Sequence, residues 1–241
     1  MVLEKQISSW LKDYLFSNNL DSFVIGISGG IDSAVTSTLC AMTGCKTIVI
    51  TMPIHQNPSE TDRGVEHCSW LTDNYKNIET LHINLTDVYE QLRKNIPSKF
   101  NNLLALANTR ARIRMSTLYL IAGNSKGIVV GTGNKIEDFG VGFYTKYGDG
   151  GVDISPIGDC KKTEVWELGR ELNILDEIIN AKPTDGLWDD GRTDEDQLGL
   201  NYKELEEAMS NPNSSNREKY EKIRKLNLHK MESIPVCKIP N

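Results

Sequence analysis

A short stretch near the N-terminus combines glycines, hydroxyl groups and a carboxylate in an order that suits a phosphorylated ligand. The apolar residues 23–27 read as a strand, the sequence Ser-Gly-Gly-Ile-Asp-Ser follows at residues 28–33, and an apolar helix pattern begins at residue 31. Glycines let the backbone approach a ligand, while loop N–H groups and a helix N-terminus attract an anion. Asp32 would repel a phosphate unless a cation lay between them, and Mg²⁺ is the usual bridging ion. The stretch therefore predicts a nucleotide site with a metal ion.

Two common phosphate loops do not match this stretch. A P-loop needs Lys followed by Ser or Thr after its second glycine, where this chain has Ile31 and Asp32. Residues 26–30 read Gly-Ile-Ser-Gly-Gly, which does not fit the Gly-x-Gly-x-x-Gly fingerprint of dinucleotide-binding folds. The stretch instead resembles the pyrophosphate-binding loop of the N-type ATP pyrophosphatases. A glycine turn with an ordinary Ser/Asp helix cap is the structural alternative.

A second carboxylate follows another buried-looking strand. Residues 126–130 read as a strand, the glycine-rich turn 131–133 follows, and Glu137 and Asp138 come next. If both strands end at the same edge of a sheet, Asp32 and Glu137 can hold one Mg²⁺ between the phosphates of ATP. An acidic pair at a helix N-terminus is the alternative explanation for Glu137.

Basic residues mark further places where an anion could bind. Arg110 and Arg114 are neighbours on a predicted helix, whereas Arg112 points roughly 160° away from them. One direction can then hold an ion pair or a subunit contact while the other meets a phosphate or carboxylate, and a solvated basic face is the alternative. Lys161 and Lys162 lie at the start of a predicted helix, where the dipole disfavours a cation, so they indicate an external anion, and a chance surface position is the alternative for one of them.

The glycine-rich stretch 142–156 holds more chemistry than a linker needs. It contains two tyrosines together with Lys146, Asp149 and Asp153. Aromatic faces beside amides and carboxylates suit a flat heteroaromatic ring or a ribose. This stretch is therefore a candidate site for a second substrate.

The elements that must position these residues alternate between strand and helix. The apolar pattern predicts strands at 23–27, 46–52, 78–83 and 126–130, and helices at 3–20, 31–43, 59–74, 86–96, 99–124, 160–172, 202–209 and 217–226. Such alternation is typical of an α/β fold with a doubly wound, mostly parallel sheet flanked by helices. We expect a single domain over residues 1–241. The acidic stretch 185–196 has little periodicity and is a candidate mobile lid.

Composition narrows the classes of function. The 241 residues carry a net charge of −6, so there is no general electrostatic case for a nucleic-acid partner. The five cysteines form no C-x-x-C pair, which fits reduced thiols and a cytoplasmic location. No run approaches the roughly 18 apolar residues of a membrane span.

Several of these motifs together resemble one family. They are residues 28–33, 108–115, 131–137, 142–153, 182–184, 194–199 and 229–230. In this order they resemble the bacterial type of ammonia-dependent NAD⁺ synthetase, over essentially the whole chain. The 142–153 stretch carries the most specific part of the resemblance, because the first loop alone would fit any ATP pyrophosphatase.

The resemblance implies a fold, a reaction and a set of site residues. It implies an adenine nucleotide alpha-hydrolase-like fold and a homodimer that converts deamido-NAD⁺, ATP and ammonia to NAD⁺, AMP and pyrophosphate with Mg²⁺. The metal ligands would be Asp32 and Glu137. The implied ATP-binding residues are Gly26, Ile27, Ser28, Gly29, Gly30, Ile31, Asp32, Ser33, Thr132, Lys162 and Thr184. The implied deamido-NAD⁺-binding residues are Arg112, Lys146, Asp153, His229 and Lys230.

The reaction chemistry assigns roles to a few of these groups. A carboxylate is a poor acyl donor until it attacks the α-phosphorus of ATP and becomes an acyl-adenylate. Charge then grows on the departing pyrophosphate, where Lys162 and the loop N–H groups can stabilise it. Ammonia is mostly ammonium at neutral pH, so a carboxylate that accepts its proton would help, and Asp153 or Asp149 is the candidate. Asp153 and Lys162 are therefore the predicted catalytic residues.

The sequence also departs from the family pattern and leaves other functions open. The 137–142 segment is one residue longer than in some relatives, and Asp185 stands near the position of a lid aspartate. A different ATP pyrophosphatase, such as a GMP-synthetase-like or tRNA-modifying enzyme, is one alternative. A non-catalytic adenine-nucleotide sensor is another. Glutamine-using members carry a separate amidase domain for which this chain has no room, so free ammonia is the expected nitrogen donor unless a separate partner supplies it.

Overall fold

The sheet has four strands, and every pair of neighbours is parallel. The structure is a computed structural model that describes residues 2–184, 186–187 and 192–239. The strands are β1 (Ser22–Gly26), β2 (Lys46–Thr51), β3 (Ile78–His82) and β4 (Gly127–Val129), in the order β3-β2-β1-β4. Phe23 of β1 pairs with Thr47 on one side and with Ile128 on the other. The ends of β1 and β4 therefore lie side by side at one edge of the sheet.

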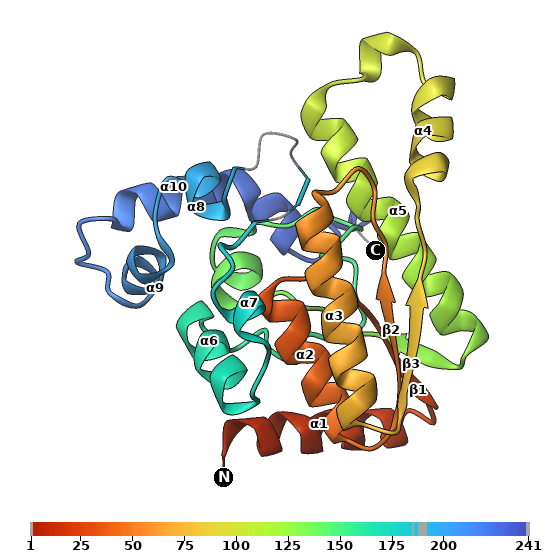
Figure 1. The fold of residues 1–241 in the computed structure, drawn as a ribbon. Helices are drawn as coiled ribbons and strands as arrows, with labels where there is room; N and C mark the ends of the chain where they lie inside the picture. The colour runs from red at the N-terminus through yellow and green to blue at the C-terminus, as the bar shows by residue number, and fades with distance from the viewer. Residues whose placement is uncertain (1, 185, 188–191, 240–241) are drawn as a thin grey trace.

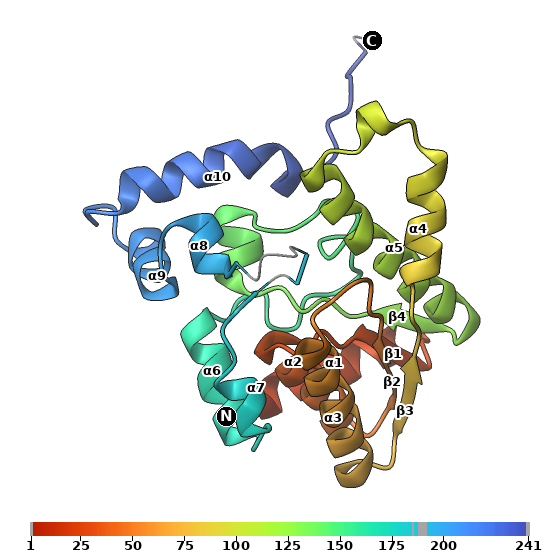
Figure 2. The ribbon, with the colours of Figure 1, turned by 45° about the horizontal axis from the view of Figure 1, so that its top comes forward.

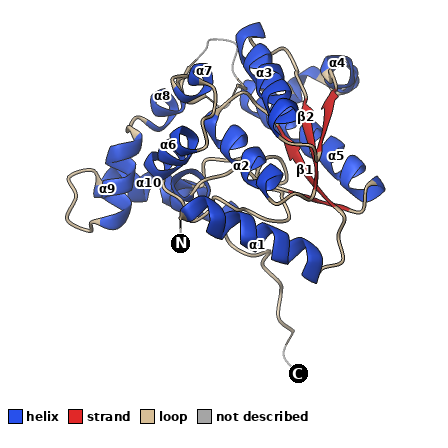
Figure 3. Cartoon of the chain, turned by 60° about the horizontal axis from the view of Figure 1, so that its bottom comes forward, coloured by secondary structure: helices blue, strands red, loops and turns tan. Residues whose placement is uncertain are grey.

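Helices cover both faces of the sheet, which confirms the predicted α/β class (Figure 1). One face packs against α1 (Leu3–Ser17), α2 (Ile31–Met42), α3 (Pro58–Asn74), α6 (Lys162–Glu171) and α7 (Asp176–Ile179). The other face packs against α4 (Thr86–Asn95) and α5 (Leu103–Asn124). Figure 3 shows the strands between these two groups of helices. Buried aliphatic side chains of the strands alternate between the two cores, as expected for a sheet that is covered on both sides.

A smaller helical cluster lies beside the carboxyl edge of the sheet (Figure 2). It contains the π-helix η2 (Lys135–Val141), α8 (Asp194–Leu198), α9 (Tyr202–Ser210) and α10 (Arg217–Met231). Its core is formed by Ile136, Val141, Leu198, Leu200, Tyr202, Leu205, Ala208 and Tyr220. Because η2 follows shortly after β4, this cluster is connected directly to the edge of the sheet at which ligands bind in α/β folds.

Several boundaries of the elements differ from the sequence predictions. The helix predicted from residue 99 begins at Leu103, because Asn102 caps it by accepting a hydrogen bond from the Ala105 N–H, and the 3₁₀ turn η1 (Ser98–Phe100) precedes it. The last helix extends to Met231 instead of 226, which includes the predicted ligand-binding residues 229–230. The candidate lid falls partly outside the described residues, and its end, residues 194–196, is the start of α8.

The segment that the family resemblance predicts to be one residue longer than in some relatives, residues 137–142, overlaps η2. A π-helix closes its hydrogen bonds one residue further along than an α-helix, so it accommodates an extra residue within a turn. Ile136 is fully buried and Phe139 is 51% exposed, so the wider turn projects outward at Phe139. Gly142 ends the segment in the left-handed conformation, with φ of 68°.

A buried histidine in α3 makes the stability of the fold depend on pH. The ring of His67 is fully buried, stacks on Trp70, and lies 2.9 Å through Nε2 from the Ser37 hydroxyl. Burial lowers the pKa of His67 to about 4. Because the folded pKa lies below the unfolded value of about 6.5, His67 contributes its full stabilisation of the folded state above pH 6.5. This stabilisation is lost as the pH falls toward 4. We expect the free energy of unfolding to fall by about 2.5 kcal/mol through His67 alone between pH 7 and 4.5.

Urea unfolding at several pH values tests this expectation. His67→Gln keeps a hydrogen-bonding side chain but does not titrate, so its stability should depend less on pH in this range. The control is His55→Gln, since the His55 side chain is 43% exposed and pairs with Glu90 at the surface. Equal acid sensitivity of His67→Gln and the unmodified protein would contradict the assignment.

Candidate active site

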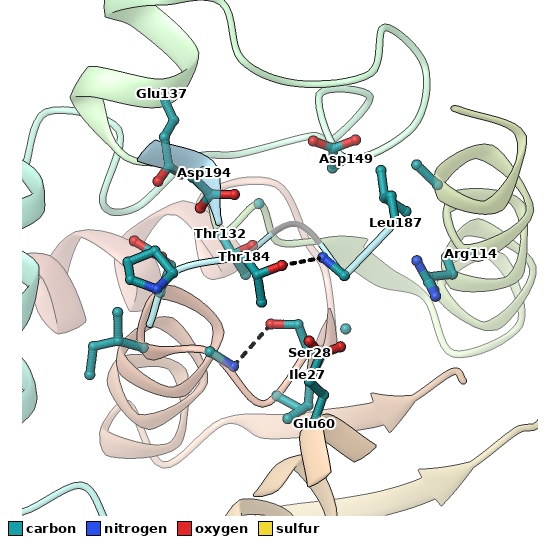
Figure 4. Close-up of a pocket in the computed structure, with 18 of the residues that line it drawn as sticks. Ile27, Ser28, Glu60, Arg114, Thr132, Glu137, Asp149, Thr184, Leu187 and Asp194 are labelled. Carbon is teal, nitrogen blue, oxygen red and sulfur yellow. Dashed lines mark hydrogen bonds between the residues drawn. The ribbon is translucent and has the colours of Figure 1, made fainter. Parts of the chain in front are cut away.

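A pocket lies at the carboxyl edge of the sheet, where β1, β2 and β4 end. Its floor is formed by residues 26–28 after β1, Met52 after β2, and residues 130–132 after β4. The start of α2, the side of α5 and the chain segment 181–184 form the walls, and Gly186, Leu187 and Asp194 lie over it. Figure 4 shows Glu137 and Asp194 at one side of the pocket and Arg114 at the other. The described elements that carry predicted ATP-binding residues therefore all either line this cavity or belong to the glycine loop beside it.

The glycine loop is pressed against the first turn of α3. Gly29 has φ of +84°, and a Cβ atom there would lie 2.3 Å from the Glu60 carbonyl oxygen, so only glycine fits. Ser28 Oγ and Ser33 Oγ lie 3.0 Å apart, and Ser28 Oγ accepts a hydrogen bond from the Gly30 N–H. At the N-cap of α2, Gly30 offers no side-chain cap for the first N–H groups of the helix. These groups can therefore bind an anion, as the sequence predicts.

The two predicted metal ligands meet at one point, where the ammonium of Lys162 lies. Lys162 Nζ is 2.5 Å from Asp32 Oδ2 and 2.9 Å from Glu137 Oε1. Lys162 is only 2% exposed. Asn134 connects the two acids, since its Nδ2 donates to Asp32 Oδ1 and its Oδ1 accepts from the N–H groups of Ile136 and Glu137. Residues that are about a hundred positions apart in the sequence thus form one buried ionic cluster.

A second layer of polar groups surrounds this cluster. The hydroxyl of Tyr202 lies 2.6 Å from Glu137 Oε1 and 3.0 Å from Asp194 Oδ2. The ring of Tyr202 also lies below Lys162, with Nζ 4.8 Å from the ring centroid. These contacts connect α9 and the start of α8 to the centre of the pocket, so the helical cluster helps to fix the position of Glu137.

The charges in the cluster shift one another's pKa values. Burial opposes the charge of Lys162, but Asp32 and Glu137 raise its pKa above the usual range, so it is an ammonium. Burial would raise the pKa of Glu137, but Lys162 and the hydrogen bonds from Tyr202 and Asn134 hold it below the usual value. Burial and the neighbouring Glu137 raise the pKa of Asp32. One cation thus faces two carboxylates, which leaves a negative excess for a second cation to neutralise.

The donor set fits Mg²⁺ bound together with phosphates. One ammonium nitrogen is within hydrogen-bond distance of both carboxylate oxygens, so a single cation can contact both. Among the described residues no cluster of three or more acidic, histidine or cysteine side chains could hold a metal alone. Mg²⁺ typically binds one or two carboxylates and completes its shell with phosphates and water. Asp32 and Glu137 would hold the ion here, and it would neutralise charge on the polyphosphate.

The predicted ATP residues and the predicted deamido-NAD⁺ residues occupy different places. Thr132 and Thr184 line the pocket, and the Thr184 hydroxyl accepts a hydrogen bond from the Gly186 N–H. Arg112 instead donates from Nε to the Lys146 carbonyl, 3.1 Å away and outside the pocket lining. The two clusters are consistent with separate subsites, and the binding roles of Arg112 and Lys146 stay predictions.

Asp153 and the two α10 residues also lie outside the pocket lining. Asp153 accepts hydrogen bonds from the Tyr119 hydroxyl at 2.7 Å and the Val129 N–H at 2.9 Å, which ties it to the end of β4. Lys230 packs over the Tyr144 ring, and the Tyr144 hydroxyl donates to its carbonyl. His229 is exposed. The catalytic role of Asp153 stays a prediction, and the alternative carboxylate, Asp149, lines the pocket.

Three groups at the centre of the site have no assigned role in the sequence predictions. Asn134 directly follows the glycine-rich turn after β4. Its position in this candidate ligand-binding turn could have identified it as a site residue from the sequence. Tyr202 and Asp194 come from helices far along the chain, and no spacing rule connects them with Glu137. Lys162 contacts Asp32 and Glu137 in this structure, and its expected role toward the phosphates of ATP stays a prediction.

Comparisons with known proteins show which family and which fold this chain resembles. The family model of NAD synthase matches residues 3–239. The NH(3)-dependent NAD(+) synthetase of Carboxydothermus hydrogenoformans is 39% identical over 209 residues, which cover 85% of this chain and 83% of that protein. The structure of NMN synthetase from Francisella tularensis superposes with a TM-score of 0.91 at 32% identity and covers 98% of both chains. The NH3-dependent NAD synthetase from Campylobacter jejuni, at 24% identity and a TM-score of 0.79, shares the fold over 98% of both chains.

The family model thus spans almost the whole chain, and a relative well above 30% identity matches most of it. The matched range contains the glycine loop, the ionic cluster and the 142–153 stretch. The chain therefore belongs to the NAD synthase family.

Proposed function

We propose that this protein is an ammonia-dependent ligase that amidates the nicotinate carboxylate of deamido-NAD⁺ and forms NAD⁺, AMP and pyrophosphate. The observation that carries the proposal is the convergence of Asp32 and Glu137 on one cation beside a glycine loop. This is the arrangement that a reaction with a departing pyrophosphate requires. The relatives named NH(3)-dependent NAD(+) synthetase support ammonia as the nitrogen donor.

The residues of the pocket can perform both halves of this reaction. The loop N–H groups at the start of α2 stabilise charge on the departing pyrophosphate, and Lys162, the predicted catalytic lysine, holds Asp32 and Glu137 in place for the metal. Asp32 and Glu137 would hold Mg²⁺, which would neutralise charge on the phosphates. Asp149 lines the same cavity and is our candidate for accepting the proton of ammonium, with Asp153 as the predicted alternative. Leu187 and Asp194, which lie over the pocket, help to keep water from the adenylate.

A second candidate acceptor is nicotinate mononucleotide, which would give NMN. It is favoured by the close likeness to the Francisella tularensis NMN synthetase, whose TM-score of 0.91 exceeds the 0.79 of the Campylobacter jejuni NAD synthetase at equal coverage. The chemistry at the carboxylate is the same for both acceptors. The two acceptors differ only in that deamido-NAD⁺ carries an adenylyl group attached to the mononucleotide.

Assembly and location complete the proposal. Large apolar side chains are exposed on α4 and α5, namely Val88, Leu92, Leu103, Leu104 and Leu120. Such a surface fits a homodimer, in which the dinucleotide would lie at the subunit interface. No helix in the described parts of the chain has the length and apolar character to cross a membrane. The five cysteines are all free thiols, which supports a cytoplasmic enzyme.

The test is an amidation assay with ATP, Mg²⁺, ammonium and either deamido-NAD⁺ or nicotinate mononucleotide. We expect AMP and the amidated product in equal amounts, and no product when any one component is omitted. The ratio of kcat/KM for the two acceptors decides between NAD⁺ and NMN synthesis. AMP release with another acceptor only would favour a different ATP pyrophosphatase, and nucleotide binding without turnover would favour a sensor.

A further inference from the structure

Among the described residues, four cationic side chains line the pocket, and they differ in the polar partners that they contact. Lys162 is neutralised by Asp32 and Glu137. Arg114 donates to the Met52 carbonyl and to the side chain of Gln56. Lys182 is exposed at the rim. Arg63 of α3 is the fourth, and its guanidinium contacts the glycine loop.

The glycine loop holds Arg63 at its phosphate-binding end. Arg63 Nε donates to the Gly29 carbonyl at 3.2 Å. The two terminal nitrogens of the guanidinium share one carbon with Nε, so they must lie next to the loop. The close approach of Gly29 to the Glu60 backbone fixes the first turn of α3 against the same loop. The guanidinium is therefore placed by two backbone contacts and not by a flexible side chain alone.

A polyphosphate needs a further positive charge in this pocket, and the guanidinium of Arg63 can supply it. The Lys162 ammonium already faces two carboxylates, so it brings no net positive charge to a polyphosphate. A polyphosphate needs cations within a few ångströms, and an arginine can offer two parallel N–H donors to phosphate oxygens. Among the residues that the structure describes, the salt bridges include none to Arg63, so its charge is available to a ligand.

We infer that Arg63 binds the β- and γ-phosphates of ATP, the part that leaves as pyrophosphate, through the terminal nitrogens of its guanidinium. The inference rests on the proposed function, because it assigns a further residue to the same ATP site. The Nε contact with Gly29 puts the group at the glycine loop, where the phosphates of ATP are expected to bind. Arg63 thus acts on the leaving group and makes no contact with the adenosine.

Arg63→Gln separates the two roles of the side chain. Glutamine has its Nε2 at the same number of bonds from Cα as arginine has Nε, so it can keep the donor to the Gly29 carbonyl. It lacks the terminal nitrogens and the charge. Isothermal titration with Mg·ATP, magnesium pyrophosphate and AMP should show affinities for ATP and pyrophosphate that fall by roughly 10- to 100-fold, the effect of a lost charged hydrogen bond. The affinity for AMP should stay within twofold.

Controls distinguish a failure of this inference from a failure of the proposed function. Arg93→Gln removes an exposed arginine that pairs with Glu90 and should leave all three affinities unchanged. Arg63→Lys keeps the charge and should lose less affinity for pyrophosphate than Arg63→Gln. Unchanged ATP and pyrophosphate affinities, or an equal loss for AMP, would overturn the role of Arg63. The proposed function fails separately, if the unmodified protein binds ATP but amidates neither nicotinate acceptor.

Discussion

Replacing Lys162 with methionine is expected to destabilise the folded protein and to make its melting temperature depend strongly on Mg²⁺. The substitution keeps most of the length of the side chain but leaves Asp32 and Glu137 facing each other in a buried site without their shared cation. Removing one partner of a buried ionic cluster costs about 3–5 kcal/mol. A divalent ion can take the place of the ammonium, and at a hundredfold excess over its dissociation constant it should raise the melting temperature by about 5–10 °C.

Thermal unfolding with and without MgCl₂, in the absence of ATP, measures this effect independently of activity. The unmodified protein should respond little, because Lys162 already occupies the space between the carboxylates. Lys135→Met is the matched control, since Lys135 pairs with Asp159 at the surface and its loss should change neither stability nor the response to Mg²⁺ by much. A Lys162→Met protein that is as stable as the original and indifferent to Mg²⁺ would rule out a shared cation position.

Asp32→Ala is expected to lower kcat by at least about a thousandfold while the fold remains intact. A metal-bridged carboxylate contributes several kcal/mol to stabilising the charge of the transition state, and about 4 kcal/mol corresponds to this factor. The fold should persist because Lys162 keeps its contact with Glu137 and Asn134 still caps η2 through its own oxygen. Product formation from deamido-NAD⁺ at saturating substrates is the measurement, and circular dichroism checks the fold.

The control for this substitution is Asp159→Ala. The side chain of Asp159 is 98% exposed, so its removal should leave the rate unchanged. If Asp32→Ala retained near-original activity, neither the metal role of Asp32 nor its place next to the phosphates could be maintained. A loss of the folded state instead would show that the ionic cluster is needed for stability first.

The convergence of Asp32 and Glu137 could be predicted because it depends on local patterns and one general rule. Each acid follows a glycine-rich turn after an apolar strand, and the carboxyl ends of parallel strands meet at one edge. The family resemblance at residues 142–153 was equally visible in the sequence. The helix-strand alternation likewise determined the fold class before any contact was known.

Other parts of the site could not be read from the sequence, because they depend on tertiary packing. A lysine at the start of a helix indicates an anion nearby, but nothing in the pattern tells whether the anion is a substrate or a buried carboxylate of the same chain. Tyr202 reaches Glu137 only because α9 folds back against η2. Arg63 had no signal at all, since its role follows from the close approach of the glycine loop to α3.

The π-helical turn of η2 can accommodate a change in the length of the chain near the active site. One residue inserted into an α-helix rotates everything beyond it by about 100°, which would displace every later side chain of the site. In η2 an additional residue is accommodated where Phe139 projects outward. This point lies between the fixed N-cap at Asn134 and the left-handed Gly142. A residue added or removed at this point should therefore leave the directions of Glu137 and of the 142–153 stretch unchanged.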